Sequence, residues 1–246
     1  MPHIEIAAEI LFTIFGFPVT NTLIMTWIVL ALLVYLAFRI SRSMSMIPKT
    51  LQNIGEIMLE SFLGLMAGMM HSRKLAEQYV PIVATIFLFI LISNWFGILP
   101  GVGTIGIYEQ HEGKQLLVPI LRSAASDLNV TLALGTLAVL LINITGMIVK
   151  GPRKHLSKYF TLKNPIDAFV GILEFISEFA KIISFSFRLF GNIFAGEVLL
   201  IIVGFLAPFA GPLPFLVLEL FVGFVQALVF AMLTMVFISI ATADHH

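Results

Sequence analysis

The sequence predicts an all-α, polytopic membrane protein with about five membrane-embedded helices and one amphipathic surface helix. Hydrophobic residues make up 59% of the 246 residues before the 18 glycines are counted, whereas soluble domains are about 45–50% apolar with glycine included. Charged residues make up 11%, under half of the roughly 25% that is typical of soluble domains. Several apolar runs reach the length of about 20 residues that a helix needs to cross a bilayer. We therefore expect residues 1–246 to form a single membrane domain.

Charge balance and cysteine content exclude several classes of function. The 14 Lys and Arg residues balance the 14 Asp and Glu residues, and nucleic-acid binding or disorder would need an excess of charge. The absence of cysteine excludes disulfides, thiol nucleophiles and cysteine-ligated metals. His71, His111 and His155 lack the spacing of metal ligands, and we expect them to be exposed polar residues. We expect no nucleic-acid partner, no bound metal and no cofactor.

The first third of the chain holds one spanning helix and one surface segment. Residues 20–38 are uncharged and end at Arg39 and Arg42, so we expect them to cross the membrane. Residues 47–79 contain charged residues among apolar residues that recur three and four positions apart. That spacing predicts an amphipathic helix that lies on the membrane surface or on a partner. The N-terminal stretch has no Lys or Arg before its apolar residues, and we expect it to be retained rather than cleaved as a signal peptide.

Four further segments are long and apolar. Residues 80–99 and 128–149 are uncharged and predict a hairpin of two spanning helices. As one helix, residues 165–206 would be about 63 Å long, twice the apolar thickness of about 30 Å, so this segment must tilt steeply or break. Residues 215–242 form the last apolar helix. We expect the last two helices to be long and strongly tilted.

The distribution of Lys and Arg predicts the orientation, because cytoplasmic loops carry the excess of these residues. Five lie in residues 39–79 and five in residues 150–163, whereas residues 100–127 hold two and residues 207–214 hold none. These counts alternate as five crossings require. We therefore expect an external N-terminus and a cytoplasmic C-terminus.

Ionisable residues interrupt the last two apolar helices. They are Glu174, Glu178, Lys181, Arg188, Glu197 and Glu219. Each costs about 2.5–3.5 kcal/mol at the centre of a membrane helix, so such residues face a partner or a water-filled path and mark ion routes. Structural ion pairing is the alternative, and it stays open for Glu178 and Lys181, which are three residues apart. Arg188 differs, because no acid lies within four residues of it.

The polar residues of segment 165–206 fall on different faces of the expected helix. One stripe, about 80° wide, contains Glu174, Lys181, Ser184, Arg188 and Asn192. Glu197 lies about 13.5 Å beyond Arg188 and about 180° around the axis, whereas Gln226 shares a face with Glu219 on the last helix. Arg stays charged when buried, and buried carboxylates can exchange protons near neutral pH. The layout suits two aqueous half-paths divided by a cation, with a partner that receives the proton.

Residues 188–197, RLFGNIFAGE, carry a resemblance to a known family. They resemble the signature of subunit a of the F-type ATP synthase, the membrane stator beside the rotating ring of c subunits. Three further features support the resemblance: Asp127-Leu-Asn-Val-Thr131, Glu174 fourteen residues before Arg188, and Gln226-Ala-Leu-Val-Phe-Ala-Met-Leu-Thr234. When the expected surface helix between the first and second spans is included, the resemblance extends over nearly the whole chain in the order of the family.

The resemblance implies a proton-translocating subunit that provides two offset half-channels and is not catalytic by itself. Arg188 would face the essential carboxylate of each passing c subunit and keep the half-channels separate. Asn192 would line the polar route, and Gln226 would lie near Arg188. Proton flow would then drive rotation of the ring and ATP synthesis.

The resemblance also assigns the acids and the partners. Glu197 and Glu219 would serve the external half-channel, Glu174 the cytoplasmic one, and Lys181 would be structural or line the exit. The partners would be the c-subunit ring, the b-type peripheral stalk subunits, other subunits of the ATP synthase, the lipid bilayer and protons. The location would be the inner (plasma) membrane of a bacterium rather than that of a mitochondrion.

Two other classes of protein compete with this interpretation. A secondary transporter would have inverted repeats with broken helices in both halves, whereas the intramembrane charges here all lie in the last third. An intramembrane hydrolase would need a nucleophile or metal motif, and neither GxSxG nor HExxH occurs. The sequence therefore favours the stator subunit.

Overall fold

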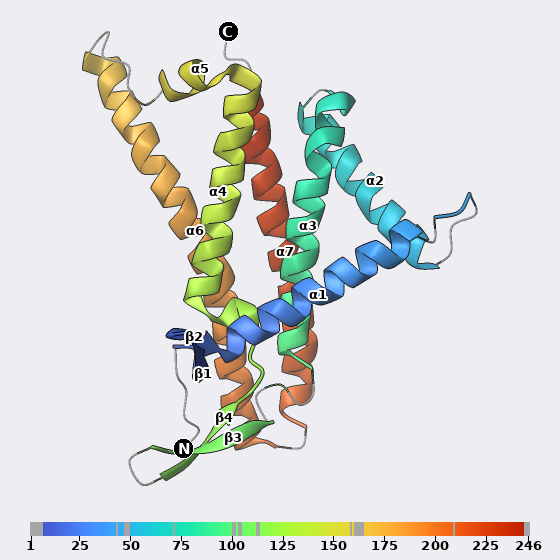
Figure 1. Cartoon of the computed structure of the whole chain (residues 1–246), viewed down its shortest axis with the longest axis vertical. Coiled ribbons are helices and arrows are strands. Elements are labelled where there is room, and N and C mark those ends of the chain that lie inside the picture. The colour runs from blue at the N-terminus through green and yellow to red at the C-terminus, as the bar shows by residue number, and fades with distance from the viewer. Residues whose placement is uncertain are drawn as a thin grey trace.

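Helices make up most of the computed structural model, which describes residues 7–42, 44–46, 50–70, 72–99, 102, 105–111, 114–157, 159, 165–208 and 210–243. In chain order the elements are β1 (Ile10–Ile14), β2 (Phe17–Thr20), α1 (Asn21–Arg42), α2 (Thr50–Met70), α3 (Arg73–Gly97), β3 (Gly106–His111), β4 (Lys114–Pro119), the short 3-10 helix η1 (Ala124–Ser126), α4 (Leu128–Lys150), α5 (Pro152–Ser157), α6 (Pro165–Leu206) and α7 (Pro212–Thr242). The strands lie at one end of the molecule, and α5 and the end of α7 lie at the other (Figure 1).

Five of the described helices, α1, α3, α4, α6 and α7, are long and apolar enough to cross a membrane. This finding confirms the predicted all-α, polytopic membrane fold. Helices α3, α4, α6 and α7 alternate in direction (Figure 1). α7 packs on α3, α4 and α6, and α4 also packs on α6. Their shared core includes Val83, Ile90, Leu189, Phe230 and Met235, each with no more than 1% of its surface exposed.

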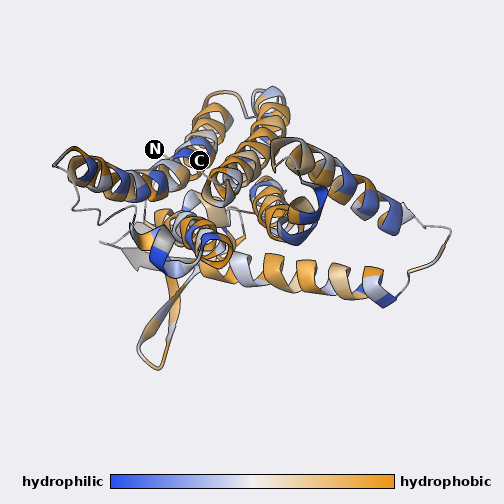
Figure 2. Ribbon diagram, turned by 90° about the horizontal axis from the view of Figure 1, so that it is seen from above, coloured by the Kyte–Doolittle hydropathy of each residue, from blue (hydrophilic) through white to orange (hydrophobic). Residues whose placement is uncertain are grey.

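Helices α1 and α2 lie outside this group of four. α1 extends away from it, as Figures 1 and 2 both show, and its buried apolar residues, Met25 and Val29, lie in its first half. α2 packs on α3, where the ring of Phe62 lies 5.1 Å from the ring of Phe87. The exposed apolar residues of α1 suit a lipid environment, because lipid solvates them as well as a protein core does.

The boundary between the predicted surface segment 47–79 and the predicted span 80–99 differs from the structure. α2 ends at Met70 and α3 begins at Arg73, after the hydroxyl of Ser72 accepts a hydrogen bond from the backbone N–H of Leu75. Residues 73–79 therefore belong to the spanning helix. The charges of Arg73 and Glu77 suggested a surface segment, but both side chains are exposed at the start of α3, where they pair with each other.

Segment 165–206 forms one unbroken helix, α6, of 42 residues. Of the two outcomes that its length allows, tilting or breaking, the helix does not break. α7 is 31 residues long and starts at Pro212, three residues before the predicted start. Proline is tolerated there because the first helical positions need no hydrogen-bonded N–H.

Two short hairpins were not predicted. β1 pairs with β2 through a turn at Phe15 and Gly16, both with positive φ, and β3 pairs with β4. No periodic pattern in the sequence indicated these hairpins, because two-stranded ribbons lack the long periodic signal of a helix. The second hairpin leads directly to the segment that carries Arg122.

The start of α4 and its packing on α6 determine how the site is assembled. Asp127 caps α4 by accepting a hydrogen bond from the N–H of Asn129 at 2.8 Å. Further along α4, a Cβ on Gly135 would overlap the hydroxyl of Ser186 and lie 3.0 Å from the carbonyl oxygen of Ile182, both on α6. Glycine is therefore required for the close approach of these two helices.

Candidate functional site

Arg188 lies near the middle of α6 on an exposed face of the helix. Its Nη2 donates a hydrogen bond to Oγ of Ser184, one turn earlier, at 3.3 Å. Among the described residues, Arg188 forms no ion pair. The neighbouring side chains of Ile183 and Phe187 are also exposed, so the charge of Arg188 lies on an open, largely apolar surface.

One turn beyond Arg188, a hydrogen bond joins α6 to α7. Nδ2 of Asn192 donates to Oε1 of Gln226 at 2.7 Å. Gln226 is 4% exposed, and its Nε2 has no hydrogen-bond partner among the described residues. The structure thus brings together two of the residues that the sequence singled out, next to the arginine.

Glu219 of α7 packs against α6 at Gly196. A Cβ at Gly196 would lie 2.6 Å from Oε1 of Glu219, so any larger residue here would displace the carboxyl group from its present position. Glu219 is 8% exposed, and its Oε2 has no hydrogen-bond partner within the described parts of the chain. Because Gly196 immediately precedes Glu197, the carboxyl group of Glu219 packs on the turn of α6 that carries Glu197.

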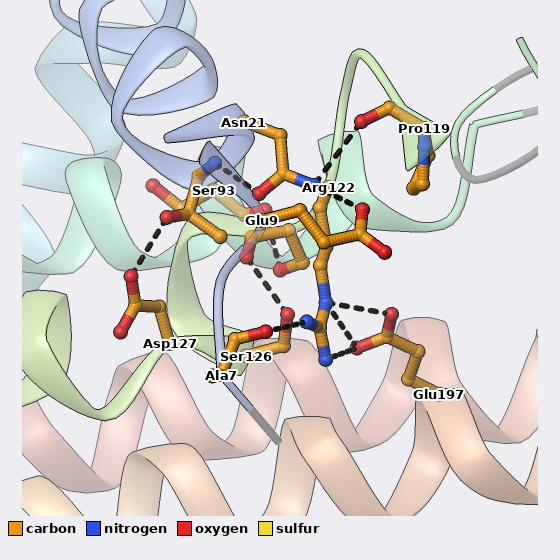
Figure 3. Close-up of polar contacts among 11 residues, drawn as sticks. Ala7, Glu9, Asn21, Ser93, Pro119, Arg122, Ser126, Asp127 and Glu197 are labelled. Carbon is orange, nitrogen blue, oxygen red and sulfur yellow. Dashed lines mark hydrogen bonds and ion pairs between the residues drawn. The ribbon is translucent and has the colours of Figure 1, made fainter. Parts of the chain in front are cut away.

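Glu197 forms an ion pair with Arg122, a residue for which the sequence predicts only a place in an external loop. Nε of Arg122 lies 3.0 Å from Oε1 and 3.4 Å from Oε2 of Glu197, and Nη2 lies 3.4 Å from Oε2 (Figure 3). The two residues are 75 positions apart, so no local pattern predicts the pair. The sequence offered one weak signal that Arg122 has a specific role: it lies five residues before Asp127, in a loop that contains few cations.

A second polar cluster joins α4, α5 and α6 at the other end of the molecule. Oε1 of Glu178 accepts from Nζ of Lys181 at 2.7 Å and from the hydroxyl of Tyr159 at 3.0 Å. Oε2 of Glu178 accepts from Nδ2 of Asn143 at 2.9 Å, and Oδ1 of Asn143 interacts with the ring of His155 at 3.0 Å. The structure supports the interpretation that Glu178 and Lys181 form a structural ion pair.

Two members of this cluster differ from expectation or were missed. His155 was expected to be exposed, but it is 4% exposed and hydrogen-bonded, because α5 folds back onto α4. His71 and the side chain of His111 lie outside the described residues. Burial, followed by the charges of Glu178 and Glu174, raises the pKa of Tyr159 above its ordinary value of 10.0, so its hydroxyl stays a donor.

Glu174 lies on α6 one turn before Glu178 and close enough to Tyr159 to influence its ionisation. At 1.5 Å per residue, about 21 Å of helix separates Glu174 from Arg188, and about 13.5 Å separates Arg188 from Glu197. The unbroken α6 therefore carries an exposed cation with acids at a distance on both sides. Fold and site together define a multi-pass helical membrane protein with ionisable groups inside its apolar helices, which is typical of proteins that move ions.

Comparison with known proteins identifies the family. The family described as ATP synthase A chain matches residues 23–239. ATP synthase subunit a of Gloeobacter violaceus is 37% identical over 230 residues, which cover 92% of this chain and 85% of that protein. The protein of the same description from Desulforamulus reducens is 34% identical, covering 92% of this chain and 82% of its own length. The one from Campylobacter jejuni is 32% identical, covering 85% of this chain and 84% of its own length.

The chain therefore belongs to the ATP synthase subunit a family, and it is a multi-pass membrane protein. This result confirms the resemblance inferred from residues 188–197, which lie within the matched region.

Proposed function

We propose that this chain is the proton-translocating stator subunit of a rotary F-type ATP synthase. In this role it provides two offset half-channels and an arginine, Arg188, beside a ring of c subunits. The subunit makes and breaks no covalent bond of ATP. It couples proton flow to rotation of the ring, and the rest of the complex uses that rotation for ATP synthesis.

One observation supports this proposal most directly: Arg188 lies exposed on α6 without an ion pair among the described residues. A cation on an apolar membrane surface is unfavourable unless a partner supplies the opposite charge. A carboxylate on each passing c subunit would supply it. Because the guanidinium stays protonated, it can attract a deprotonated carboxylate but cannot itself pass on a proton.

The acids on either side of Arg188 would form the two half-channels. Glu219 and Glu197, on the side of the hairpins, would serve the external half-channel, and Glu174 would serve the cytoplasmic one. Asn192 and Gln226 join α6 to α7 beside Arg188 and would line the polar route. Since Arg188 separates the two groups along α6, a proton could pass between them only on the ring.

The same proposal includes partners and orientation. The c-subunit ring would cover the face of α6 that carries Arg188, and b-type peripheral stalk subunits and other subunits of the ATP synthase would hold the chain in place. The location would be the inner membrane of a bacterium. The basic residues 150–163 favour a cytoplasmic position for α5 and the C-terminus, with the hairpins and the N-terminus outside.

Substitution of Arg188 tests the proposal. We expect Arg188→Ala to abolish ATP-driven proton pumping in vesicles that contain the assembled complex, because nothing then separates the two half-channels. The matched control is Arg73→Gln, which removes an arginine from an exposed ion pair with Glu77 and should pump normally. Normal pumping by Arg188→Ala in a fully assembled complex would refute the proposed role.

A further inference from the structure

The two acids assigned to the external half-channel have different surroundings. Both oxygens of Glu197 accept hydrogen bonds from the guanidinium of Arg122, whereas Oε2 of Glu219 has no partner among the described residues. Charge-assisted hydrogen bonds from a guanidinium stabilise the deprotonated form of a carboxylate, and protonation of that carboxylate would weaken them. Glu219 has no such bonds to break at Oε2. The geometry therefore separates the roles of two residues that their positions in the sequence do not distinguish.

Arg122 is held in place by contacts with several parts of the chain. Its Nη1 donates to the carbonyl oxygen of Ala7 at 3.1 Å, which ties the described N-terminal segment to Glu197 (Figure 3). The next residue, Ser123, lies against α3, where a Cβ at Gly97 would be 2.5 Å from Cβ of Ser123. The backbone of Ser123 also starts η1, since its carbonyl accepts from the N–H of Ser126. Because the backbone around Arg122 is held by these contacts, the guanidinium of Arg122 has a defined position.

Burial within the pair is unequal. The side chain of Arg122 is 8% exposed and that of Glu197 is 29% exposed. Breaking a buried pair leaves the remaining charge uncompensated in a low-dielectric environment. Loss of Glu197 would thus leave a nearly buried cation close to the turn of α6 against which Glu219 packs.

Taking the proposed function as given, we infer that Arg122 is a positioning residue of the external half-channel: it holds Glu197 as a fixed counter-charge and leaves Glu219 as the acid that exchanges protons. Arg122 and Glu197 then act as one neutral unit. The proton passes by Glu219, and the pair keeps the electrostatic environment of that acid constant.

The test compares variants of Arg122 and Glu197 by passive proton conduction through the assembled complex in vesicles, driven by an imposed membrane potential. Arg122→Gln and Glu197→Gln should each reduce conduction by about tenfold or more, equivalent to about 1.4 kcal/mol in barrier height. Arg122→Lys should conduct faster than Arg122→Gln because it retains the charge. The double variant Arg122→Gln/Glu197→Gln should conduct several-fold faster than Glu197→Gln, because no uncompensated charge remains.

Two controls separate this effect from a loosened fold. Arg73→Gln removes an arginine from an exposed ion pair and should conduct normally. Thr22→Val removes the buried 2.7 Å hydrogen bond to Asp127 in the same region without touching Glu197, and it should also conduct normally. The amount of each variant chain in the purified complex gives its assembly.

The outcomes distinguish the inference from the proposed function. If the double variant conducts no faster than Glu197→Gln while Glu219→Gln slows conduction, Glu197 itself carries protons and only the inference fails. If Glu219→Gln conducts normally in an assembled complex, both the inference and the proposed role of Glu219 in the external half-channel fail. Loss of conduction in Thr22→Val equal to that in Arg122→Gln would reduce Arg122 to a structural residue and overturn the inference.

Discussion

The hydrogen bond between Asn192 and Gln226 offers a direct test of how α6 and α7 are joined. It is 2.7 Å long, and Gln226 is 4% exposed. Asn192→Ala removes the hydrogen-bond donor, so the buried oxygen Oε1 of Gln226 no longer accepts a hydrogen bond from α6. Gln226→Leu instead replaces the buried amide by an apolar group of similar size. Asn192 also loses its partner in this variant, but Asn192 is exposed, so the loss costs less free energy than it does for the buried Gln226.

The magnitude follows from the burial of the two partners. An unsatisfied buried polar group costs about 1–3 kcal/mol, and single hydrogen bonds in membrane proteins contribute about 0.6 kcal/mol on average and about 1.7 kcal/mol at most. Because this bond is short and one partner is buried, we expect Asn192→Ala to lower the free energy of unfolding by about 1–2 kcal/mol. In a Gln226→Leu background the same substitution should cost about 1 kcal/mol less.

Reversible unfolding of the chain in mixed detergent micelles measures these free energies. Fluorescence of Trp95 is a suitable probe, since its Nε1 donates to the carbonyl oxygen of Leu220 at 3.1 Å and thus reports on the packing of α3 against α7. The two single variants and the double variant complete the cycle. Additivity of the two substitutions to within about 0.3 kcal/mol would show that this hydrogen bond does not hold α6 to α7.

Two further predictions concern the close packing of Glu219 and the ionisation of Tyr159. Gly196→Ala should lower passive proton conduction by about tenfold with assembly intact, because its Cβ would displace the carboxyl group of Glu219, and small displacements of reacting groups are costly. Gly64→Ala, whose added Cβ would extend into open space, is the control, and equal conduction by both variants would contradict the steric argument. Since the pKa of Tyr159 is raised in the folded protein, deprotonation above about pH 10 favours the unfolded chain, so the free energy of unfolding should fall as the pH rises further. Unfolding measured at pH 9 to 11 should show a smaller fall in Tyr159→Phe, and an identical fall would exclude the burial of this hydroxyl.

The helices and their chemistry could be predicted because they depend on local sequence. An uncharged run of about 20 residues identifies a span wherever it lies, and the helical repeat then places Arg188 and Asn192 on one face. The unbroken α6 keeps that spacing. Boundaries were less predictable, as the start of α3 at Arg73 illustrates, because a charged first turn can extend beyond the apolar run.

Contacts between polar groups on distant segments could not be predicted from the sequence. The pairing of Glu197 with Arg122 joins positions 75 residues apart, and the burial of His155 depends on how α5 folds back onto α4. Such contacts depend on the packing of distant segments, for which a single sequence carries no periodic signal. Local sequence is therefore enough to predict the membrane helices and the acids and arginine that they carry. Which of those charges are paired and which remain available depends on the folded chain, because pairing requires close approach of atoms that lie far apart in the sequence.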